Sequence, residues 1–309
     1  MDVDVVILWA DRPIVHAQGR NCTDGSNHGK RTRDNGELKF LLRSIGNLPW
    51  IRNVYVVVSE GLPTWLNATS VISIPHSQIF PHWWGLPSFN SFAIEAHVHR
   101  IESLSEHFLL LNDDLVFLKQ VPRSFFFPSP DKLRVCISNK FLDLDVDSEW
   151  DNSVSFAHRN ANAILGPSIT YRKRFWHHTK PLIKSACAEV YTTFSKEFEK
   201  MSYSPYRERT TDLSIYELAY HLLGEQRLAS SSSIEFIQIN ELDEMKCRMV
   251  NLQDDYKDFE LDFKSSLRVN PAFLCVNDDM SDEANPDVLN LYQQVMQKLF
   301  PFPSRYESS

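Results

Sequence analysis

The stretch "HFLLLNDDLVFL" (residues 107–118) is an apolar run interrupted by Asn112, Asp113 and Asp114. Continuous apolar runs of this length are typical of strands that are buried on both faces, as in the parallel sheets of α/β proteins. A second run, "FLCVNDD" (273–279), ends in the same three residues much later in the chain. The sequence therefore predicts two buried strands that end in similar acidic segments.

The regions before this stretch alternate between strand-like and helix-like patterns. Asp34, followed three residues later by Glu37, is a plausible cap for the first helix, and Asn90 or Ser91 for the second. An order of strand, helix and strand predicts a mainly parallel, Rossmann-like sheet with helices on its faces, which is the α/β class. The predicted strands are 3–10, 53–59, 71–75 and 107–118, and the predicted helices are 34–48 and 88–104.

After about residue 150 the chain becomes mainly helical in pattern, and from about residue 230 strand-like and helix-like patterns alternate again. We interpret the 309 residues as one domain, with a core at about 1–150 and 230–300 and a helical insertion at about 150–230. The expected helices are 156–165, 180–201, 210–224 and 286–299, and the expected strands are 233–240 and 271–279.

The overall composition excludes some classes of partner. A net charge of -8, from 40 acidic and 32 basic residues, argues against non-specific binding to nucleic acid or to an anionic membrane. No apolar stretch is long enough to span a bilayer. Five scattered cysteines without CxxC spacing predict reduced thiols: Cys22, Cys136, Cys187, Cys247 and Cys275.

The acidic strand ends are the first candidates for chemistry. Ligands of open α/β sheets bind beyond the carboxyl ends of the strands, where Asp11 and both Asn-Asp-Asp segments are expected. Carboxylates gathered at one edge repel each other and need a cation, for which oxygen ligands favour Mg²⁺ or Mn²⁺. Nucleotide-sugar transferases place an acidic pair after a buried strand in the same way. Taken singly, each segment is equally compatible with an ordinary turn.

Basic residues and histidines precede three of the predicted helices. Lys30, Arg31 and Arg33 lie just before the helix at 34–48, where a helix N-terminus favours an anion such as a diphosphate, although a solvated loop has the same composition. The pairs His177 with His178 and Arg207 with Arg209 repeat this arrangement: they stand in "FWHHTKP" and "YRERTTD".

Glu95 and His99 are four residues apart in the predicted helix at 88–104 and therefore share a face. A histidine beside a carboxylate can serve as a general base, but more often the two form a structural hydrogen bond. The chain contains no GxGxxG, GxxxxGK[ST] or GxSxG motif, which argues against the usual dehydrogenases, P-loop enzymes and α/β-hydrolases.

Several stretches together resemble the four ordered conserved blocks of the Stealth family. The second block is the densest: it comprises "RTRDNGELKFLLRSI", "LPTWL" and "LPSFNSFAIEAHVHRIESLSEHFLLLNDDLVF". "DVVILWAD" is similar to the first block, "HHTKP" with the following Arg-containing segment to the third, and "FLCVNDDM" with "LFPFPS" to the fourth. The family includes bacterial capsular-polysaccharide hexose-1-phosphate transferases and the catalytic subunit of an N-acetylglucosamine-1-phosphotransferase.

The resemblance implies roles for particular residues. The acidic positions of the family fall on Asp113, Asp114, Asn277 and Asp278, and a metal site is expected at Asp113, Asp114 and Asp278. The essential histidine falls on His178, with His177 as the alternative, and the arginine before a helix on Arg207 or Arg209. Substrate contacts are expected from Trp9, Asp11, Arg33, Asp34, Asn35, Glu37, Arg43, Asn90, Ser91, Glu95, His99, Asn112 and Asn277.

The implied activity is transfer of a sugar-1-phosphate from a UDP-sugar to an acceptor hydroxyl of a glycan, with release of UMP and with Mg²⁺ or Mn²⁺ as cofactor. Two alternatives stay open, namely a metal-dependent glycosyltransferase that releases UDP and a non-catalytic carbohydrate-binding protein. Capsule synthesis implies a cytoplasmic protein, peripheral at the inner membrane face, with a membrane-bound glycan assembly system as partner. The N-glycosylation sequons at 21–23 and 67–69 leave a Golgi-like lumen as an alternative location.

Overall fold

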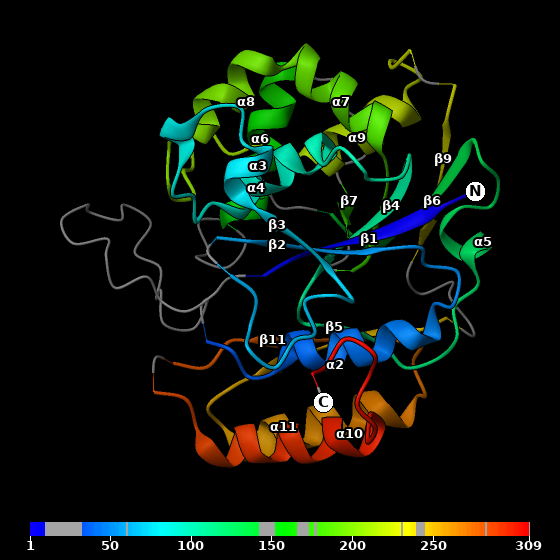
Figure 1. Cartoon of the computed structure of the whole chain (residues 1–309), viewed down its shortest axis with the longest axis vertical. Helices are drawn as coiled ribbons and strands as arrows, with labels where there is room; N and C mark the ends of the chain where they lie inside the picture. Colours follow the sequence, from blue (N-terminus) through cyan, green and yellow to red (C-terminus); the bar gives the residue numbers. More distant parts are fainter. Residues whose placement is uncertain are drawn as a thin grey trace.

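The chain folds into an α/β structure built on three sheets (Figure 1). This computed structural model describes residues 1–9, 33–59, 61–141, 152–165, 173–175, 178–229, 231–238, 245–281 and 283–308. The strands are β1 (Val3–Leu8), β2 (Val54–Val58), β3 (Ile72–Pro75), β4 (His107–Asn112), β5 (Leu115–Phe117), β6 (Lys132–Phe141), β7 (Lys173–Phe175), β8 (Lys180–Ile183), β9 (Ser233–Gln238), β10 (Cys247–Leu252) and β11 (Phe273–Asp278).

The main sheet has the strand order β3-β2-β1-β4-β8. Its first four strands are parallel, and β8 runs antiparallel to β4. These strands are short and apolar, and β1, β2 and β4 are buried on both faces, as the sequence predicts for a parallel sheet. The α/β class with a mainly parallel central sheet is therefore confirmed.

Helices cover the main sheet on one face, and a second layered unit lies on the other (Figure 1). The helices of the first face are α3 (His76–Ile79), α4 (Ser91–His97), α6 (Asn152–Leu165), α7 (Lys184–Thr193), α8 (Ser195–Ser202) and α9 (Ile215–Gly224), with the 3₁₀ turns η2 (Trp83–Gly85) and η3 (Val98–Arg100). On the opposite face lie α2 (Glu37–Ser44), η1 (Ile45–Asn47) and the second sheet, β10-β11-β5. The third sheet, β7-β6-β9, and α5 (Arg123–Phe126) complete the fold.

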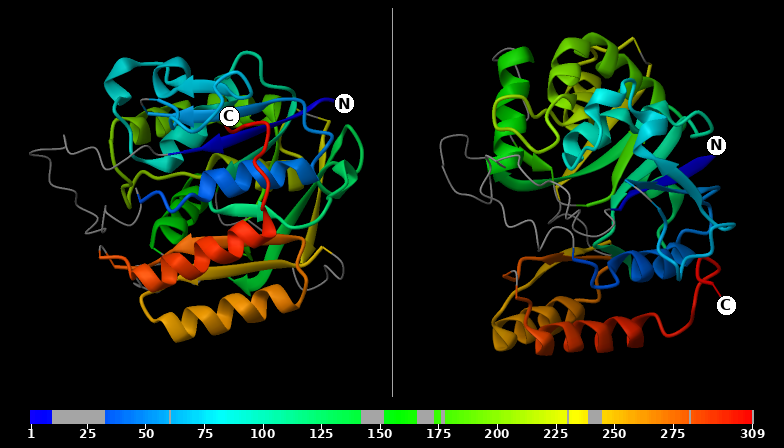
Figure 2. Two further views of the ribbon diagram at one scale, coloured as in Figure 1. Left: turned by 60° about the horizontal axis from the view of Figure 1, so that its bottom comes forward. Right: turned by 60° about the vertical axis from the view of Figure 1, so that its left-hand side comes forward.

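Two helices close the second unit on its outer side, namely α10 (Tyr256–Arg268) and α11 (Pro286–Leu299). Alternate residues of β11 face opposite ways, so Phe273 and Cys275 pack toward the main sheet while Leu274 and Val276 pack toward these helices. Both views in Figure 2 show this layering, with the red C-terminal segment returning from α11. It ends beside the loop after β2, where the Asn67 N–H donates to the Tyr306 carbonyl at 2.8 Å.

Three of the predicted elements are placed differently in the structure, and β6, β7, β10 and α10 were not predicted. The stretch 107–118 is two strands in different sheets, because the chain turns at Asp113-Asp114. Residues 180–183 form β8 and are not the start of a helix, since they pair with β4. The strand at 271–279 joins the second sheet rather than the main one.

The cap of α2 also differs, whereas that of α4 is as predicted. Gly36, at a φ of 85°, precedes α2, and the Asp34 carboxylate accepts from the Gly36 N–H at 2.8 Å instead of capping the helix. The left-handed glycine turns the chain before the helix starts, so Asp34 caps that turn. At α4, Asn90 accepts from the Phe92 N–H as an N-cap.

Candidate functional site

The two Asn-Asp-Asp segments meet at one edge of the structure. The Val276 N–H donates to the Asp114 carbonyl at 2.9 Å, and the Cys275 thiol lies 3.4 Å from the Asp114 carboxylate. Since β11 runs antiparallel to β5, with Cys275 opposite Leu115, its carboxyl end returns to the point where β5 begins. The predicted meeting therefore occurs, but through β5 and not through neighbouring parallel strands.

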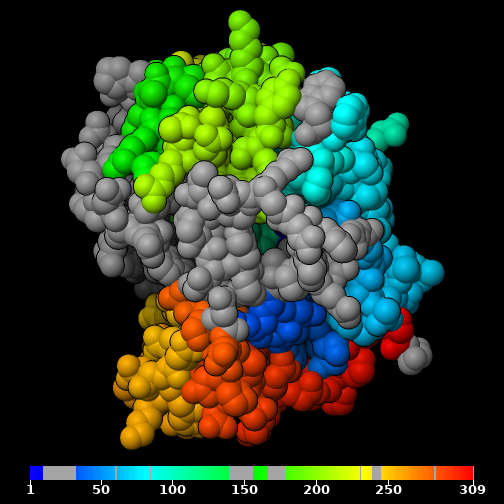
Figure 3. Space-filling model, turned by 90° about the vertical axis from the view of Figure 1, so that its left-hand side faces the viewer, coloured from blue at the N-terminus to red at the C-terminus, as the bar shows by residue number. Residues whose placement is uncertain are grey.

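The start of α2 adds a third segment to this edge. The Asn35 amide donates to Glu37 at 2.8 Å and to Asp278 at 3.0 Å, so it bridges the two carboxylates. Arg33 forms an ion pair with Asp278 at 3.1 Å. Figure 3 looks onto this edge and shows the blue segment at the start of α2 beside the orange segment after β11. Asp278 is thus held by protein donors, and the Met280 N–H adds another at 3.0 Å.

The carboxylates of this edge lie in an environment that opposes their charge. Burial raises the pKa of Asp113 well above its usual value, and the charges of Glu37, Asp114 and Asp34 raise it further. Burial also raises the pKa of Glu37 to about 7, against the hydrogen bonds that it accepts from its own N–H and from Asn35. Asp34, Glu37, Asp113, Asp114 and Asp278 therefore share this edge with one arginine, Arg33, among the described residues, and that arginine is paired with Asp278.

His178 lies two residues before β8. That strand begins at Lys180, which pairs with Leu110 of β4 and whose ammonium donates to the Asn112 side chain. The His178 ring is buried, and it packs edge-on against Phe273 with 4.4 Å between ring centroids. Its Nδ1 lies 3.2 Å from the Thr179 carbonyl. The histidine thus packs against the residue that begins β11, at the opposite end of that strand from Asp278.

A buried lysine that the sequence prediction did not single out connects this edge to α4. The Lys180 ammonium donates to the Asn112 side-chain oxygen at 3.1 Å and lies 3.5 Å from the Glu95 carboxylate. It also lies over the ring of Tyr216, 4.8 Å from its centroid. Lys180 stands within the quoted "HHTKP" motif, but the prediction of a helix there hid its strand position and its partners.

The two candidate arginines lie in different surroundings. Arg207 donates to the Ser91 hydroxyl at 2.7 Å and stacks over Phe92 at the start of α4. Arg209 stacks over Phe156 of α6 at 5.1 Å. Arg207 thus contacts the start of α4 and Arg209 contacts α6, and which of them serves the site stays a prediction. The loop of Arg207 is held by the buried Asp212, a residue that the prediction missed.

Asp212 joins the loop of Arg207 to the N-terminus of α4. It accepts from the Asn90 amide at 2.7 Å and from the Glu208 N–H at 2.9 Å. Burial raises the pKa of Asp212 to about 6, against these hydrogen bonds. Asn90 is therefore a structural link as well as a cap.

Several predicted residues lie apart from this edge or outside the described part. Glu95 and His99 do not form the predicted pair, because Glu95 faces Lys180 whereas the His99 ring packs 5.1 Å from that of Tyr191, and burial lowers the pKa of His99 to about 4. Trp9, in contrast, lies near the edge, because it directly follows β1, whose last residue Leu8 pairs with Asn112; its side chain is buried, and its backbone N–H donates to the Val57 carbonyl. Asp11, Lys30, Arg31 and His177 lie outside the described residues.

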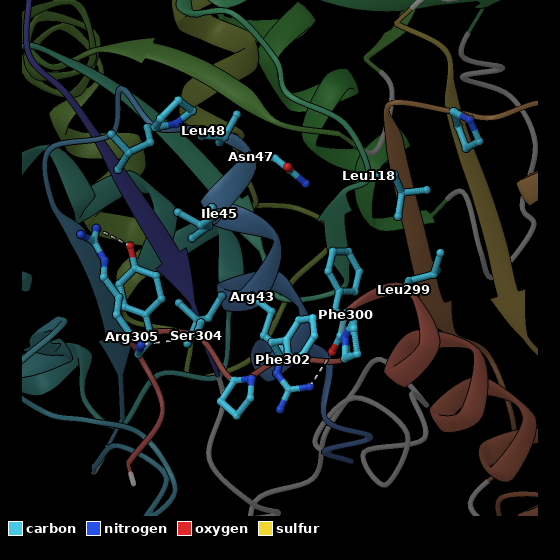
Figure 4. A pocket seen from close by; sticks show the side chains of 18 of the residues that line it. Arg43, Ile45, Asn47, Leu48, Leu118, Leu299, Phe300, Phe302, Ser304 and Arg305 are labelled. Atoms are coloured by element: carbon cyan, nitrogen blue, oxygen red, sulfur yellow. Dashed lines mark hydrogen bonds between the residues drawn. The ribbon is translucent and has the colours of Figure 1, made fainter.

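Arg43 lies at the opposite end of α2 and holds the C-terminal segment. It forms an ion pair with Glu307 at 2.6 Å and donates to the Phe300 carbonyl at 2.7 Å. It lines a cavity of about 890 Å³ that is walled by residues 299–306 (Figure 4). No acidic or histidine side chain lines this cavity, so it offers no group for acid–base or metal chemistry.

The described residues contain no preformed metal cage. In the ranges given above, no group of three or more His, Cys, Asp or Glu side chains is arranged to enclose a metal ion. The same ranges contain no helix with both the length and the apolar character needed to cross a membrane. The cysteines among them, Cys136, Cys187, Cys247 and Cys275, are buried thiols.

Comparison with known proteins gives matches to one family. Residues 31–135 match Stealth protein CR2, conserved region 2, and residues 265–309 match Stealth protein CR4, conserved region 4. The exopolysaccharide phosphotransferase CpsY of Mycobacterium leprae is 28% identical over 324 residues, which cover 99% of this chain and 57% of the relative. An exopolysaccharide phosphotransferase of Streptomyces coelicolor is 30% identical with the same coverage. The chain spans about half the length of the curated relatives it matches.

One solved structure completes the comparison. The galactosyltransferase LgtC in complex with donor and acceptor sugar analogs has a TM-score of 0.46 and 10% identity, and the match covers 97% of this chain and 98% of that one.

Proposed function

We propose, from the premise that this chain belongs to the Stealth family, that it moves a sugar-1-phosphate from a UDP-sugar to a hydroxyl group of a glycan acceptor. The names of its relatives, exopolysaccharide phosphotransferases, support the class of reaction. The observation that carries the proposal is the meeting of both Asn-Asp-Asp segments with Glu37 at one edge.

The acidic side chains fit a divalent cation. Asp113 and Asp114 would hold Mg²⁺ or Mn²⁺, which would neutralise the diphosphate of the donor. Mg²⁺ is commonly held by only one or two carboxylates together with phosphate oxygens of the substrate, so a complete protein cage is not required. The raised pKa of Asp113 supports this assignment, because a nearby cation would offset the repulsion from Glu37 and Asp114.

The proposed step breaks one phosphorus–oxygen bond. The acceptor hydroxyl attacks the β-phosphorus, a new P–O bond forms, and the bond from the β-phosphorus to the bridging oxygen breaks, so that UMP leaves with its electron pair. Arg207 neutralises negative charge on the transferring group, and His178 accepts the proton of the hydroxyl. If His178 instead attacks first, a phospho-sugar adduct on its ring precedes transfer. The sugar C1–O bond stays intact, so the anomeric configuration is retained.

The test follows the β-phosphorus of the donor. The protein is incubated with a panel of UDP-sugars labelled at that atom, with Mn²⁺ and glycan acceptors. We expect UMP in solution and the label in a phosphodiester of the product. Release of UDP that carries the label would instead identify a glycosyltransferase, and binding of sugars without any turnover would identify a carbohydrate-binding protein. Mass spectrometry of the quenched protein distinguishes the two roles of His178.

A further inference from the structure

Two segments on the helical side of the molecule run together along their length, and we call their contact the seam. The segments are residues 82–91 and 199–207. His82 faces Glu199 at 3.9 Å, the Phe89 N–H donates to the Pro205 carbonyl at 2.7 Å, and Arg207 donates to Ser91 at 2.7 Å. The contacts follow the same order in both segments, so the His82–Glu199 pair marks one end of the seam and the Ser91–Arg207 pair marks the other.

At Gly85 the two segments approach closely. A Cβ atom at this position would lie 3.0 Å from the Ser202 carbonyl oxygen and 3.0 Å from the Phe80 ring. A side chain there would therefore force the segments apart. The glycine keeps the first segment in register with the second.

Aromatic side chains lie along the seam, and two of them are exposed to solvent. Trp83 is 81% exposed and Tyr203 is 57% exposed. Farther along, the rings of Phe89 and Tyr206 stack with their centroids 5.4 Å apart and their planes 23° from parallel. We call these four residues the aromatic platform. Exposed Trp and Tyr are the residues that most often anchor a ligand, since each offers a large apolar face and a polar group.

One end of the seam reaches the candidate site. Ser91 begins α4, and Glu95, one turn later, faces the Lys180 that holds Asn112. Arg207 is four positions after Tyr203, which sets an upper limit of roughly 14 Å on the distance between their Cα atoms. In Figure 3 the cyan and yellow-green parts of the chain, which carry the two segments, adjoin in the upper part of this face.

We infer that the aromatic platform is a subsite for the sugar rings of the acceptor glycan, next to the transfer site; this inference rests on the proposed function. A pyranose ring has one face of C–H groups and an edge of hydroxyl groups. The exposed faces of Trp83 and Tyr203 match the first, and the polar pair His82 and Glu199 matches the second. A membrane surface does not fit, because that pair adds no net basic charge and the chain has a net charge of -8.

The test compares Trp83→Ala and Tyr203→Ala with the control Phe302→Ala. Phe302 is also 81% exposed, but it lies at the cavity beyond the far end of α2. Binding is measured on an array of cello-, malto- and N-acetylchito-oligosaccharides that range from monosaccharides to hexasaccharides. We expect the wild type and Phe302→Ala to retain at least one hexasaccharide, and Trp83→Ala to bind it roughly tenfold more weakly.

Two outcomes overturn the subsite. One is a Trp83→Ala protein that binds saccharides as the wild type does, and the other is a wild type that retains none. If light scattering shows that the wild type self-associates and Trp83→Ala does not, and no saccharide binds, the platform is an interface between copies and the subsite is again overturned.

The two proposals fail separately. Saccharide binding that depends on Trp83, without UMP release from any UDP-sugar, would support the platform and contradict the transferase. UMP release from a protein whose saccharide binding is unchanged by Trp83→Ala would support the transferase and contradict the platform. UMP release by water alone, without acceptor, should be equal in wild type and in the control Phe302→Ala, since Phe302 lies at a separate cavity.

Discussion

Asp113 combines burial with like-charged neighbours, and both effects disfavour its ionised form. A carboxylate whose ionisation is unfavourable contributes little to the stability of the fold. Stability therefore does not explain why an aspartate occupies this position. A bound cation supplies an explanation, because it would reverse the sign of the local field. The same residue is therefore expected to matter for activity and to be dispensable for stability.

Asp113→Asn tests this expectation directly. We expect UMP release to fall at least about a hundredfold, as is typical when a main electrostatic contact to the transferring group is lost. The thermal midpoint at pH 8 should stay equal or rise, since the change removes a repelled charge. Asp258→Asn, on the exposed first turn of α10, is the matched control and should change neither quantity. A large loss of stability in Asp113→Asn would show that the carboxylate is structural.

Lys180 has the opposite character, because it pairs with a buried partner. Lys180→Met leaves the Glu95 carboxylate buried without its cation, which should cost about 3 kcal/mol of stability and lower activity through Asn112. Adding Glu95→Gln should restore much of the thermal midpoint but not the activity. If the effects of Lys180→Met and Glu95→Gln on the free energy of unfolding are additive in a double-mutant cycle, the two side chains do not interact and the pairing is contradicted.

His97 gives a prediction about pH. Burial, together with the nearby His99, Arg100 and His82, lowers the pKa of His97 to about 3, and its Nε2 lies 3.0 Å from the Ser202 hydroxyl. The unfolded chain binds a proton near pH 6.5, but the folded chain does not. The contribution of His97 to stability is therefore complete above pH 6.5 and is lost as the pH falls toward 3, at about 1.4 kcal/mol per unit.

The variant His97→Phe isolates this contribution. At pH 8 it should be less stable than the wild type by about 1 kcal/mol, because the hydrogen bond to Ser202 is lost. At pH 5 the difference should have moved by about 2 kcal/mol in favour of the variant. Chemical denaturation at both pH values measures the difference, in which the titrations of other groups cancel. A difference that is independent of pH would contradict the neutral state of His97.

At the scale of elements, Arg43 links α2 to the C-terminal segment. Its side chain is 8% exposed and that of Glu307 is 9% exposed, so the ion pair is largely shielded from solvent. Arg43→Met should therefore lower the free energy of unfolding by about 3 kcal/mol and leave UMP release within about twofold of wild type. Lys264→Met, which breaks the exposed pair with Glu260 on α10, should change stability by less than about 0.5 kcal/mol. A loss of activity without a loss of stability would restore Arg43 to the substrate site.

The elements also show where sequence patterns suffice and where they do not. β1, β2, β4 and β11 were predictable because each is a short apolar run, and α11 because Asn285 and Pro286 mark its start. β8 was not predictable, since four residues next to a helix have no period of their own and their pairing with β4 is a long-range contact. The position of β11 was missed for the same reason: an apolar strand does not specify which sheet it joins.

Individual site residues follow the same division. The two acidic segments could be placed from the sequence, because each follows a short apolar run. Lys180 and Asp212 could not, since their roles depend on Glu95, Asn112 and Asn90 from distant parts of the chain. A buried cation or carboxylate has no local signature, and only the fold shows its partners.

At the scale of the whole molecule, the candidate site belongs to no single layer. Its parts are the start of α2, the turn between β4 and β5, and the end of β11, which come from the main and second sheets and from distant parts of the chain. The turn at Asp113-Asp114 leaves the main sheet at β4 and enters the second at β5. A ligand held there is therefore expected to connect the two layers.

Hydrogen exchange can detect this connection. UDP with Mn²⁺ at about 100 times its dissociation constant should stabilise the folded state by about 2.7 kcal/mol. Exchange should slow together in peptides that cover 108–117 and 273–280, because both contribute to one site. The Asp113→Asn variant should lose the slowing in both peptides at once, whereas the distant Asp258→Asn should retain it. Protection confined to the first peptide would mean that the second Asn-Asp-Asp segment is only a turn beside the site, and the joint site would then be wrong.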